Sequence, residues 1–480
     1  MDSRQRASRA GVRAPIVAMK LRNGSGAKGA QEGGFVTNRP NAKEPMTVSG
    51  GTKQIGEIYD RWPWVEATVW TPRMLTALET GIKGGKWFSL IDKVYTMPNL
   101  QSSFTKVKAN AGAAGVDQQT IEMFEQDEVA NLMNLSERLR EGKYRPAAVK
   151  RVMIPKMGSQ EMRPLGIPTV RDRVVQTALR NVLEPIFERT FAAHSYGFRP
   201  KRGAKDALRR VDQLLHAGKR WVVDADLRSF FDTIPHEKLL ERVEEQIADG
   251  RVLELVNAFL QQGVMTETVI MLSEAGTPQG AVISPLLANI YLNPLDHLMV
   301  RRGFEMVRYA DDFVILCGTK GEAEEALREV ARWTQTNGLL LHPGKTQIVD
   351  AAEKGGFDFL GFHFERGHRW PRKKSLRKLK ETIRGATRRN NGQSLARIIE
   401  RVNRTLRGWF EYFKHSNRWT FPPLDRWIRM RLRSILRRRE GRRGRGRGAD
   451  HQRWRNAYFD THGLFNLEAA HNRECQSLTR

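Results

Sequence analysis

The sequence predicts an α+β protein that carries a strongly basic helical region toward its C-terminal end. Between residues 85 and 370, helical patterns of apolar residues alternate with short β-branched runs, and no stretch has the composition of a linker. From about residue 373 to 440 the pattern is helical and dense in arginine. We therefore expect one large α+β domain, or two closely joined ones, followed by a helical region.

The composition restricts the class of protein. The 480 residues are 40% hydrophobic and 28% charged, so most of the chain can bury a core and wholesale disorder is excluded. The two cysteines, Cys317 and Cys475, exclude a disulfide scaffold and a cysteine-rich zinc module and fit a reducing compartment. The sequence shows neither a long apolar run nor a signal peptide, so we expect a soluble protein with no membrane partner.

The positive charge is concentrated in two segments. The formal net charge is +28, and residues 371–450 hold 26 Lys and Arg against 6 Asp and Glu. Residues 1–40 hold 8 against 2. A nearly neutral body with a basic C-terminal segment is typical of a protein that binds a polyanion, either a nucleic acid or an anionic membrane surface. The scarcity of acids among these basic residues favours nucleic acid over a solvated helix face.

The chain divides into four segments on this evidence. The first is a basic extension that we expect to be disordered over residues 1–45, because it is rich in Gly, Ser, Ala and Arg without apolar periodicity. The last contains a glycine- and arginine-rich run, 441–448, predicted to be a flexible hinge, and a small appended module that begins at His451. The predicted boundaries are 1–60, 61–370, 371–440 and 441–480.

A pair of adjacent carboxylates, Asp311 and Asp312, lies between two β-type runs. Asp is unfavourable in strands and favourable in turns, so the pair is predicted at the tip of a hairpin. The run that follows, 313–317, is too apolar for a surface strand, which places this hairpin on a buried sheet. Two repelling carboxylates on a rigid sheet suit a divalent metal such as Mg²⁺, although a solvated Asp-Asp turn is the alternative for an isolated pair.

A second group of carboxylates ends an apolar strand. The alternation of strand residues puts Asp224 and Asp226 on the same face. A strand end with carboxylates beside a hairpin with carboxylates is the arrangement that a two-metal site requires. The alternative is a strand end whose acids form ion pairs with Arg220 and Arg228.

At this point the chain resembles a known family. Tyr309, Ala310, Asp311 and Asp312 match the fingerprint of reverse transcriptases, and the surrounding blocks resemble the reverse transcriptases and maturases encoded by mobile group II introns. The resemblance covers roughly residues 65–480 in the family's order, which is far more specific than any single motif. The blocks are RPLGIP at 163–168, SYGFRP at 195–200, GTPQG at 276–280, SPLLAN at 284–289, HPGKT at 342–346, FLGF at 359–362 and LRGWFEYF at 406–413.

The resemblance implies a right-hand polymerase with fingers, palm and thumb, and RNA-templated attack of a primer 3′-hydroxyl on a dNTP. It implies that Asp226 and Asp311 bind two Mg²⁺ ions, with Asp312 beside them. It places Phe231 under the incoming sugar, where it excludes a 2′-hydroxyl. Two alternatives stay open for this position: Phe231 is a core residue, or Asp232 reads the 2′-hydroxyl, as the spacing from Asp226 in RNA-dependent RNA polymerases suggests.

The resemblance also implies contacts with substrates. Plain surface charge is an equally good interpretation of each basic residue among them. The predicted dNTP contacts are Lys156, Arg163, Arg173 and Gln279, and the predicted template and primer contacts are Gly280 and Lys345. Further along, the helical pattern of 426–437 puts four arginines opposite the apolar face made by Ile428, Leu432, Ile435 and Leu436, and we expect these arginines to bind RNA. They are Arg426, Arg429, Arg433 and Arg437.

The function implied by the resemblance is that of a group II intron-encoded reverse transcriptase and maturase. Such a protein binds its intron RNA, assists splicing and copies the RNA into DNA at a target site. The family's His-Asn-His endonuclease domain is not expected, because the two cysteines cannot supply the cysteine pairs that usually accompany it. A splicing-only maturase and a domesticated enzyme of repair or phage defence are the alternatives. We expect a cytoplasmic location, at the nucleoid in a bacterium, with an organelle left open. The sequence does not indicate which protein partners it has.

Overall fold

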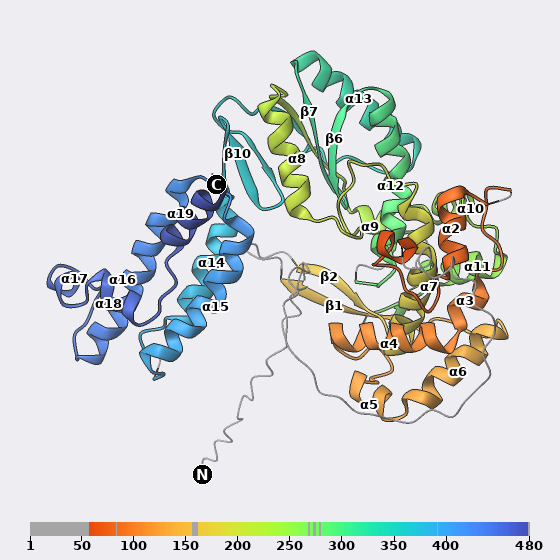
Figure 1. Cartoon of the computed structure of the whole chain (residues 1–480), viewed down its shortest axis with the longest axis horizontal. Coiled ribbons are helices and arrows are strands. Elements are labelled where there is room, and N and C mark those ends of the chain that lie inside the picture. Colours follow the sequence, from red (N-terminus) through yellow and green to blue (C-terminus); the bar gives the residue numbers. More distant parts are fainter. Residues whose placement is uncertain are drawn as a thin grey trace, which may run out of the picture.

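The computed structural model describes residues 57–82, 84–155, 162–266, 269–271, 275–277, 280–390 and 392–478. It has three parts, which we call fingers, palm and thumb after the family that the sequence resembles (Figure 1). The predicted disorder of residues 1–45 lies outside the described residues. The predicted α+β class is confirmed, because helices cover mixed and antiparallel sheets throughout the first two parts.

The fingers combine helices with a four-stranded sheet of order β2-β1-β4-β5. Strands β1 and β2 form an antiparallel hairpin, and β4 pairs with β1 in parallel. Helix α7 packs along α4, and the two helices share buried apolar side chains with α3 and α6. The elements are α2 Pro72–Thr80, α3 Ile91–Tyr95, α4 Met97–Asn110, α5 Ile121–Gln126, α6 Glu128–Arg140, β1 Val149–Pro155, β2 Met162–Ile167, α7 Val170–Glu188, β4 Val264–Thr266 and β5 Val269–Met271.

The palm is built on an antiparallel sheet of order β6-β7-β3-β8 whose two faces are both buried. Val223 and Ala225 of β3 face the large core shared with α12 and α13, whereas Val222 faces a second core with α8. Burial on both faces explains the nearly continuous apolar run of β7. The elements are α8 Ala204–His216, β3 Trp221–Asp226, α9 Phe230–Thr233, α10 His236–Glu244, α11 Gly250–Leu260, α12 Ser284–Arg301, β6 Glu305–Tyr309, β7 Asp312–Cys317, α13 Lys320–Thr336 and β8 Gln347–Asp350.

A small antiparallel sheet of order β11-β10-β9 joins the palm to the helical thumb. Phe362 of β10 packs against Phe413 of the thumb, with ring centroids 4.8 Å apart. Figure 1 shows the thumb helices on the far side of β10 from the fingers. The elements are β9 Phe357–Phe359, β10 Phe362–Glu365, β11 His368–Pro371, α14 Lys373–Ala386, α15 Leu395–Phe413, η1 Arg418–Thr420, α16 Phe421–Arg439, α17 Ala449–Arg453, α18 Asn456–Thr461 and α19 Leu467–Leu478.

The segment after residue 440 belongs to the thumb core and does not form a separate module. Trp454, Phe459 and Leu467 are buried in the same apolar cluster as Leu432 of α16. A segment with so few apolar residues cannot bury them alone, so it packs against the neighbouring helices. The predicted boundary between 371–440 and 441–480 therefore does not separate two cores, because both segments contribute to one core.

The glycine-rich run 441–448 is also held in place, against the prediction of a flexible hinge. The amide of Gly446 donates a hydrogen bond of 3.1 Å to Ser434 Oγ, and a Cβ at this position would lie 2.6 Å from Cβ of Arg433. Arg437 Nε donates to the carbonyl of Arg443 over 2.9 Å. The glycine thus serves close packing against α16.

The arginines of α16 do not all face solvent, so this part of the sequence prediction is wrong. Arg426 is exposed, but Arg429 and Arg433 are only 8% and 2% exposed. Arg433 Nε donates to the carbonyl of Trp454 over 2.8 Å, and Arg437 forms an ion pair of 2.7 Å with Asp450. The periodicity predicts the apolar face correctly, but the packing of residues 441–478 covers the opposite face as well.

Among the described residues, no helix is long and apolar enough to cross a membrane.

Candidate active site

The two adjacent carboxylates lie on the hairpin that joins β6 to β7, as the sequence predicts. Tyr309 and Asp312 are the last paired residues, so Ala310 and Asp311 form a two-residue turn. Ala310 has φ of 59°, and two-residue hairpin turns that match the strand twist require such positive values. The left-handed conformation of a non-glycine residue is unfavourable and needs support from its surroundings.

Strand β3 brings a third carboxylate directly opposite this hairpin. In the antiparallel register of β3 and β7, Asp226 pairs with Asp312. Side chains at such opposed positions have Cβ atoms about 4.5–5.5 Å apart. Asp224 lies two residues earlier on the same face as Asp226, as the alternation predicts. The predicted juxtaposition of strand end and hairpin is therefore confirmed.

The negative charges of this group contribute to a raised pKa of two of its members, Asp312 and Asp224. Burial is the main cause that raises the pKa of Asp312 to about 7, and the negative charges of Asp224, Asp311 and Asp226 add to it. Burial likewise raises the pKa of Asp224 to about 6, against the hydrogen bond that it accepts from Gln347. The site therefore holds negative charge that a cation would stabilise.

A lysine supplies one such cation. Lys345, which the sequence predicts near the primer end, lies in the loop just before β8. Its Nζ donates a hydrogen bond of 2.5 Å to Asp226 Oδ2. The amide of His342 donates to the carbonyl of Asp226 over 2.7 Å, which fixes this loop beside the strand end. The ammonium group of Lys345 thus shows that Asp226 binds a positive charge at this position.

The donor chemistry of the site fits a divalent metal. Asp226, Asp311 and Asp312 offer only carboxylate oxygens, the ligands that Mg²⁺ prefers. In the described part of the chain, no group of three or more His, Cys, Asp or Glu is gathered tightly enough to hold an ion unaided. Mg²⁺ is usually held by one or two carboxylates together with substrate phosphates, so a complete protein cage is not required.

Phe231 lies in the short helix α9, five residues after Asp226. Its ring is partly buried and meets the ring of Phe230 edge to face at 5.3 Å. Its carbonyl accepts a hydrogen bond of 2.6 Å from the amide of Thr277. A Cβ at Gly276 would lie 2.6 Å from the same carbonyl, so this glycine allows the two backbones to touch. Asp232 is exposed beside it.

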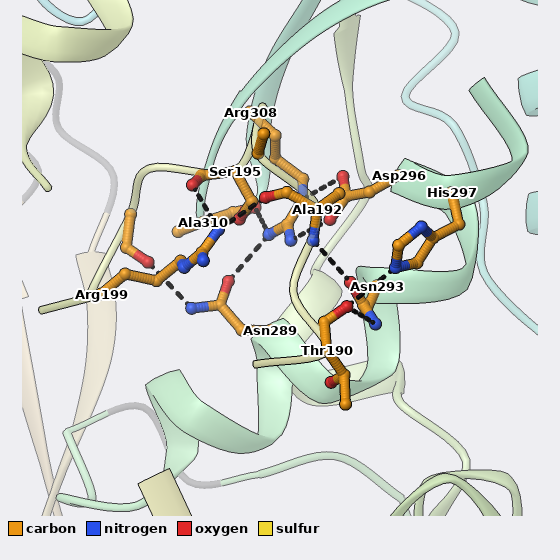
Figure 2. Close-up of polar contacts among 12 residues, drawn as sticks. Thr190, Ala192, Ser195, Arg199, Asn289, Asn293, Asp296, His297, Arg308 and Ala310 are labelled. Atoms are coloured by element: carbon orange, nitrogen blue, oxygen red, sulfur yellow. Dashed lines mark hydrogen bonds and ion pairs between the residues drawn. The ribbon is translucent and has the colours of Figure 1, made fainter. Parts of the chain in front are cut away.

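A buried arginine forms a hydrogen bond to the backbone of this turn, and the sequence analysis did not identify it. Arg308 of β6 is 0% exposed and forms hydrogen bonds on three sides (Figure 2). Its Nη1 donates to the carbonyl of Ala310 over 2.9 Å and to Asn289 Oδ1 over 2.8 Å. Its Nε donates to Asp296 Oδ1 over 2.8 Å. The signal in the sequence is a charged residue inside the apolar run of a strand buried on both faces.

The block at 195–200 packs against the same turn. A Cβ at Gly197 would lie 2.3 Å from the amide nitrogen of Ala310, so only glycine fits there. Asn289 donates to the carbonyl of Gly197 over 2.8 Å. Arg199 donates to the carbonyl of Ser195 over 2.8 Å, which closes this segment on itself (Figure 2). Motifs far apart in the sequence thus converge on one hairpin.

The predicted substrate contacts of the fingers are only partly described. Lys156 and Gln279 lie outside the described residues, and for Arg163 the structure describes only the backbone of β2. Arg173 is 8% exposed and donates from Nη2 to the carbonyl of Ala113 over 2.8 Å. Gly280 has φ of 108°, and a Cβ there would lie 2.4 Å from the carbonyl oxygen of Gly166. The backbone of Gly280 therefore lies in close contact with the backbone of strand β2.

Comparison with known proteins agrees with this arrangement. Residues 154–364 match the family described as reverse transcriptase (RNA-dependent DNA polymerase), and residues 376–454 match the group II intron, maturase-specific domain. Protein YkfC of Escherichia coli is 33% identical over 356 residues, which cover 65% of this chain and 91% of that protein. The group II intron-encoded protein LtrA of Lactococcus lactis is 36% identical over 201 residues. That match covers 42% of this chain and only 33% of LtrA.

Solved structures give weaker likenesses. A partial Cas6-RT-Cas1–Cas2 complex matches with a TM-score of 0.33 and 22% identity, over 52% of this chain and 41% of that one. Telomerase from Candida albicans matches with a TM-score of 0.40 and 12% identity, over 66% and 60%.

The fold, the carboxylate hairpin and the family match define a right-hand polymerase of the reverse transcriptase class, which depends on divalent metal. The chain belongs to the group II intron reverse transcriptase and maturase family. The maturase match extends through the thumb and includes residues beyond 440, in agreement with the single core of this part.

Proposed function

We propose that this protein copies RNA into DNA, with Asp226, Asp311 and Asp312 as the catalytic carboxylates. The opposed positions of Asp226 and Asp312 on β3 and β7 carry the proposal, because they set the carboxylates on a rigid sheet around a hairpin tip. These carboxylates would hold two Mg²⁺ ions, which would supply activation of the primer 3′-hydroxyl and charge stabilisation at the dNTP phosphates. The retained carboxylates favour a polymerase over a splicing-only maturase.

We propose Phe231 as the residue that selects deoxyribose. Its backbone is fixed by Thr277 and Gly276, and its ring is braced by Phe230 close to Asp226. A rigid ring at this place supports exclusion of a 2′-hydroxyl by contact. Lys345 remains the proposed primer-side contact, and its ion pair with Asp226, a proposed catalytic residue, supports this role.

We propose that the outer face of α14 binds RNA phosphates. The exposed basic residues of this helix form no ion pair in the described part of the chain, although Arg384 lies over the Trp427 ring. This lack of ion pairs distinguishes them from Arg437 of α16, which pairs with Asp450, and supports a polyanionic ligand. The proposed contacts on this face are Lys373, Lys374, Arg377, Lys378 and Arg384, with the exposed Arg426 as an addition.

The RNA proposed for this face is a group II intron, which the protein binds and helps to fold for splicing before copying it into target DNA from dNTPs. The splicing chemistry belongs to the RNA. For this function we propose a location in the cytoplasm, at the nucleoid in a bacterium, or in an organelle.

The proposal is tested with Asp226→Asn and Asp311→Asn, assayed for primer extension on an RNA template and for splicing of a group II intron. Extension is expected to fall at least about a hundredfold in both variants, since a charge-stabilising group is lost. Splicing assistance is expected to persist, because the proposed RNA-binding surface is the outer face of α14. Glu305→Gln, at the far end of the same hairpin, is the control and keeps both activities. Normal extension by Asp226→Asn or Asp311→Asn would refute the assignment.

A further inference from the structure

A cavity of about 310 Å³ lies in the fingers between α4, α7 and the segment before α2. None of the three proposed catalytic carboxylates is in its lining. Its walls include the partly exposed ring of Trp64, the side chain of Arg173 and Val282, which lies two residues before α12. The cavity is therefore a feature separate from the carboxylate hairpin.

The charges that line the cavity do not balance. Glu66 pairs with Lys106 over 2.8 Å, and Glu184 pairs with Arg180 over 2.7 Å. These two pairs account for both carboxylates in the lining. The remaining charged side chain is Arg173, which forms no ion pair with any carboxylate in the described part of the chain. The net positive charge of the cavity thus lies on one guanidinium.

Arg173 is held in the wall with donors left over. The residue is 8% exposed, Nη1 and Nη2 donate to the carbonyls of Ala111 and Ala113, and Nε has no partner among the described residues. Gly112 lets the guanidinium come close, since a Cβ there would lie 2.7 Å from Nη1. Burial lowers the pKa of Arg173, and the negative charges of Asp117 and Asp172 act in the opposite direction. A buried cation that no carboxylate contacts directly is costly, and an anion in the cavity would relieve this cost.

The short loop from Thr277 to Val282 connects the backbone beside Phe231 to the lining of the cavity. The amide of Thr277 donates to the carbonyl of Phe231 over 2.6 Å, and the amide of Val282 donates to Gln176 Oε1 on α7 over 2.7 Å. The four residues between these anchors allow the anchors to lie at most about 18 Å apart. At about 3.4 Å per stacked nucleotide, some five nucleotides of a single strand cover that distance.

We infer that this cavity binds a nucleotide of the single-stranded template ahead of the active site, with its phosphate on Arg173 and its base against Trp64. The inference rests on the proposed polymerase function. An aromatic side chain beside an unbalanced cation is the usual provision for single-stranded nucleic acid without sequence preference. A dNTP triphosphate is the less suitable anion, because it needs metal-binding carboxylates and both carboxylates here are already paired.

The test measures binding of primer–template duplexes by fluorescence anisotropy, with 5′ template overhangs of zero to eight nucleotides and no dNTP. The wild-type protein is expected to gain roughly tenfold in affinity as the overhang reaches the cavity. Arg173→Gln and Trp64→Ala are each expected to lose most of this gain while binding the blunt duplex as the wild type does. Arg189→Gln, an exposed change at the end of the same helix, is the control and keeps the gain.

The variant Trp64→Ala keeps the inference testable if Arg173→Gln folds poorly, because Trp64 is only partly buried. An overhang-independent affinity of the wild-type protein, or a full gain in Trp64→Ala, overturns the inference. A raised KM for dNTP in Arg173→Gln with an unchanged overhang gain also overturns it and assigns Arg173 to the triphosphate. Failure of the wild-type protein to extend primers refutes the proposed function instead, and the binding measurement separates the two outcomes.

Discussion

Arg308 and Asp296 form an ion pair of 2.5 Å in which both side chains are shielded from solvent, with 0% and 1% exposure. The same guanidinium donates to the carbonyl of Ala310, the residue with positive φ in the turn between β6 and β7. An ion pair excluded from water is not a reliable source of stability, because desolvation offsets the attraction. Its value here is geometric, since it fixes the donor that holds the strained turn.

This relationship predicts different effects on stability and on activity. Arg308→Met is expected to lower the free energy of unfolding by about 3–5 kcal/mol, because it leaves Asp296 charged and buried. Arg308→Met combined with Asp296→Leu should recover much of this loss but still extend primers poorly, because the Ala310 carbonyl stays without its donor. Urea denaturation and primer extension measure the two effects. Recovery of extension together with stability would show that Arg308 serves stability alone.

The assignment of Phe231 predicts a change in sugar selection. Phe231→Val is expected to raise incorporation of rNTP relative to dNTP by at least about tenfold, since the ring no longer meets the 2′-hydroxyl. Competition between the two nucleotides in primer extension measures the ratio, and RNA binding should be unchanged. Asp232→Asn is the matched control and should leave the ratio as it is. A change in Asp232→Asn alone would transfer the role to that carboxylate.

The ion pair of Lys345 with Asp226 predicts an effect on metal binding. The ammonium competes with Mg²⁺ for this carboxylate, but the pair is partly exposed and therefore weak. Lys345→Met is expected to lower the Mg²⁺ concentration for half-maximal extension by up to about fivefold. A titration of extension with Mg²⁺ at saturating dNTP checks this. A higher requirement would mean that Lys345 assists the metal site.

The raised pKa of Asp312 predicts that metal binding depends on pH. Its pKa of about 7 lies above the ordinary carboxyl value of about 3.9, so between these values the folded protein without metal holds a proton that the unfolded chain lacks. Mg²⁺ must displace this proton, and the half-maximal concentration should rise as pH falls below 7, by up to about tenfold per unit. Titrations at pH 6, 7 and 8 test the slope. A pH-independent requirement would contradict the assignment of Asp312.

The separation of surface and internal arginines predicts two kinds of thumb variant. Replacing Arg377 and Lys378 of α14 with Gln should weaken RNA binding and reduce the slope of log affinity against log salt by about 1.4, as for two lost phosphate contacts on single-stranded RNA. Arg433→Met should lower stability through the loss of its bond to Trp454 but keep the slope. Filter binding at several salt concentrations distinguishes the two. Equal slopes in all proteins would exclude α14 as the phosphate-binding face.

The sequence by itself determined the palm sheet and the place of its carboxylates. Asp224 and Asp226 end an apolar strand, and Asp311 and Asp312 interrupt a longer apolar stretch at a turn. Because strand alternation and turn preference act over a few residues, these local patterns predict the hairpin without knowledge of the rest of the chain. The same holds for the apolar face of α16.

Only the tertiary structure decided what lies against those elements. Arg433 looks like a surface residue by periodicity, yet the segment beyond residue 440 covers it, and the hydrogen bond from Arg433 to Trp454 replaces contact with water. Arg308 likewise shows its role only when Asp296 and Ala310, brought from a helix and a turn, surround it. Burial and charge pairing depend on segments that are distant in the chain, and periodicity contains no information about which segment will pack against a given face.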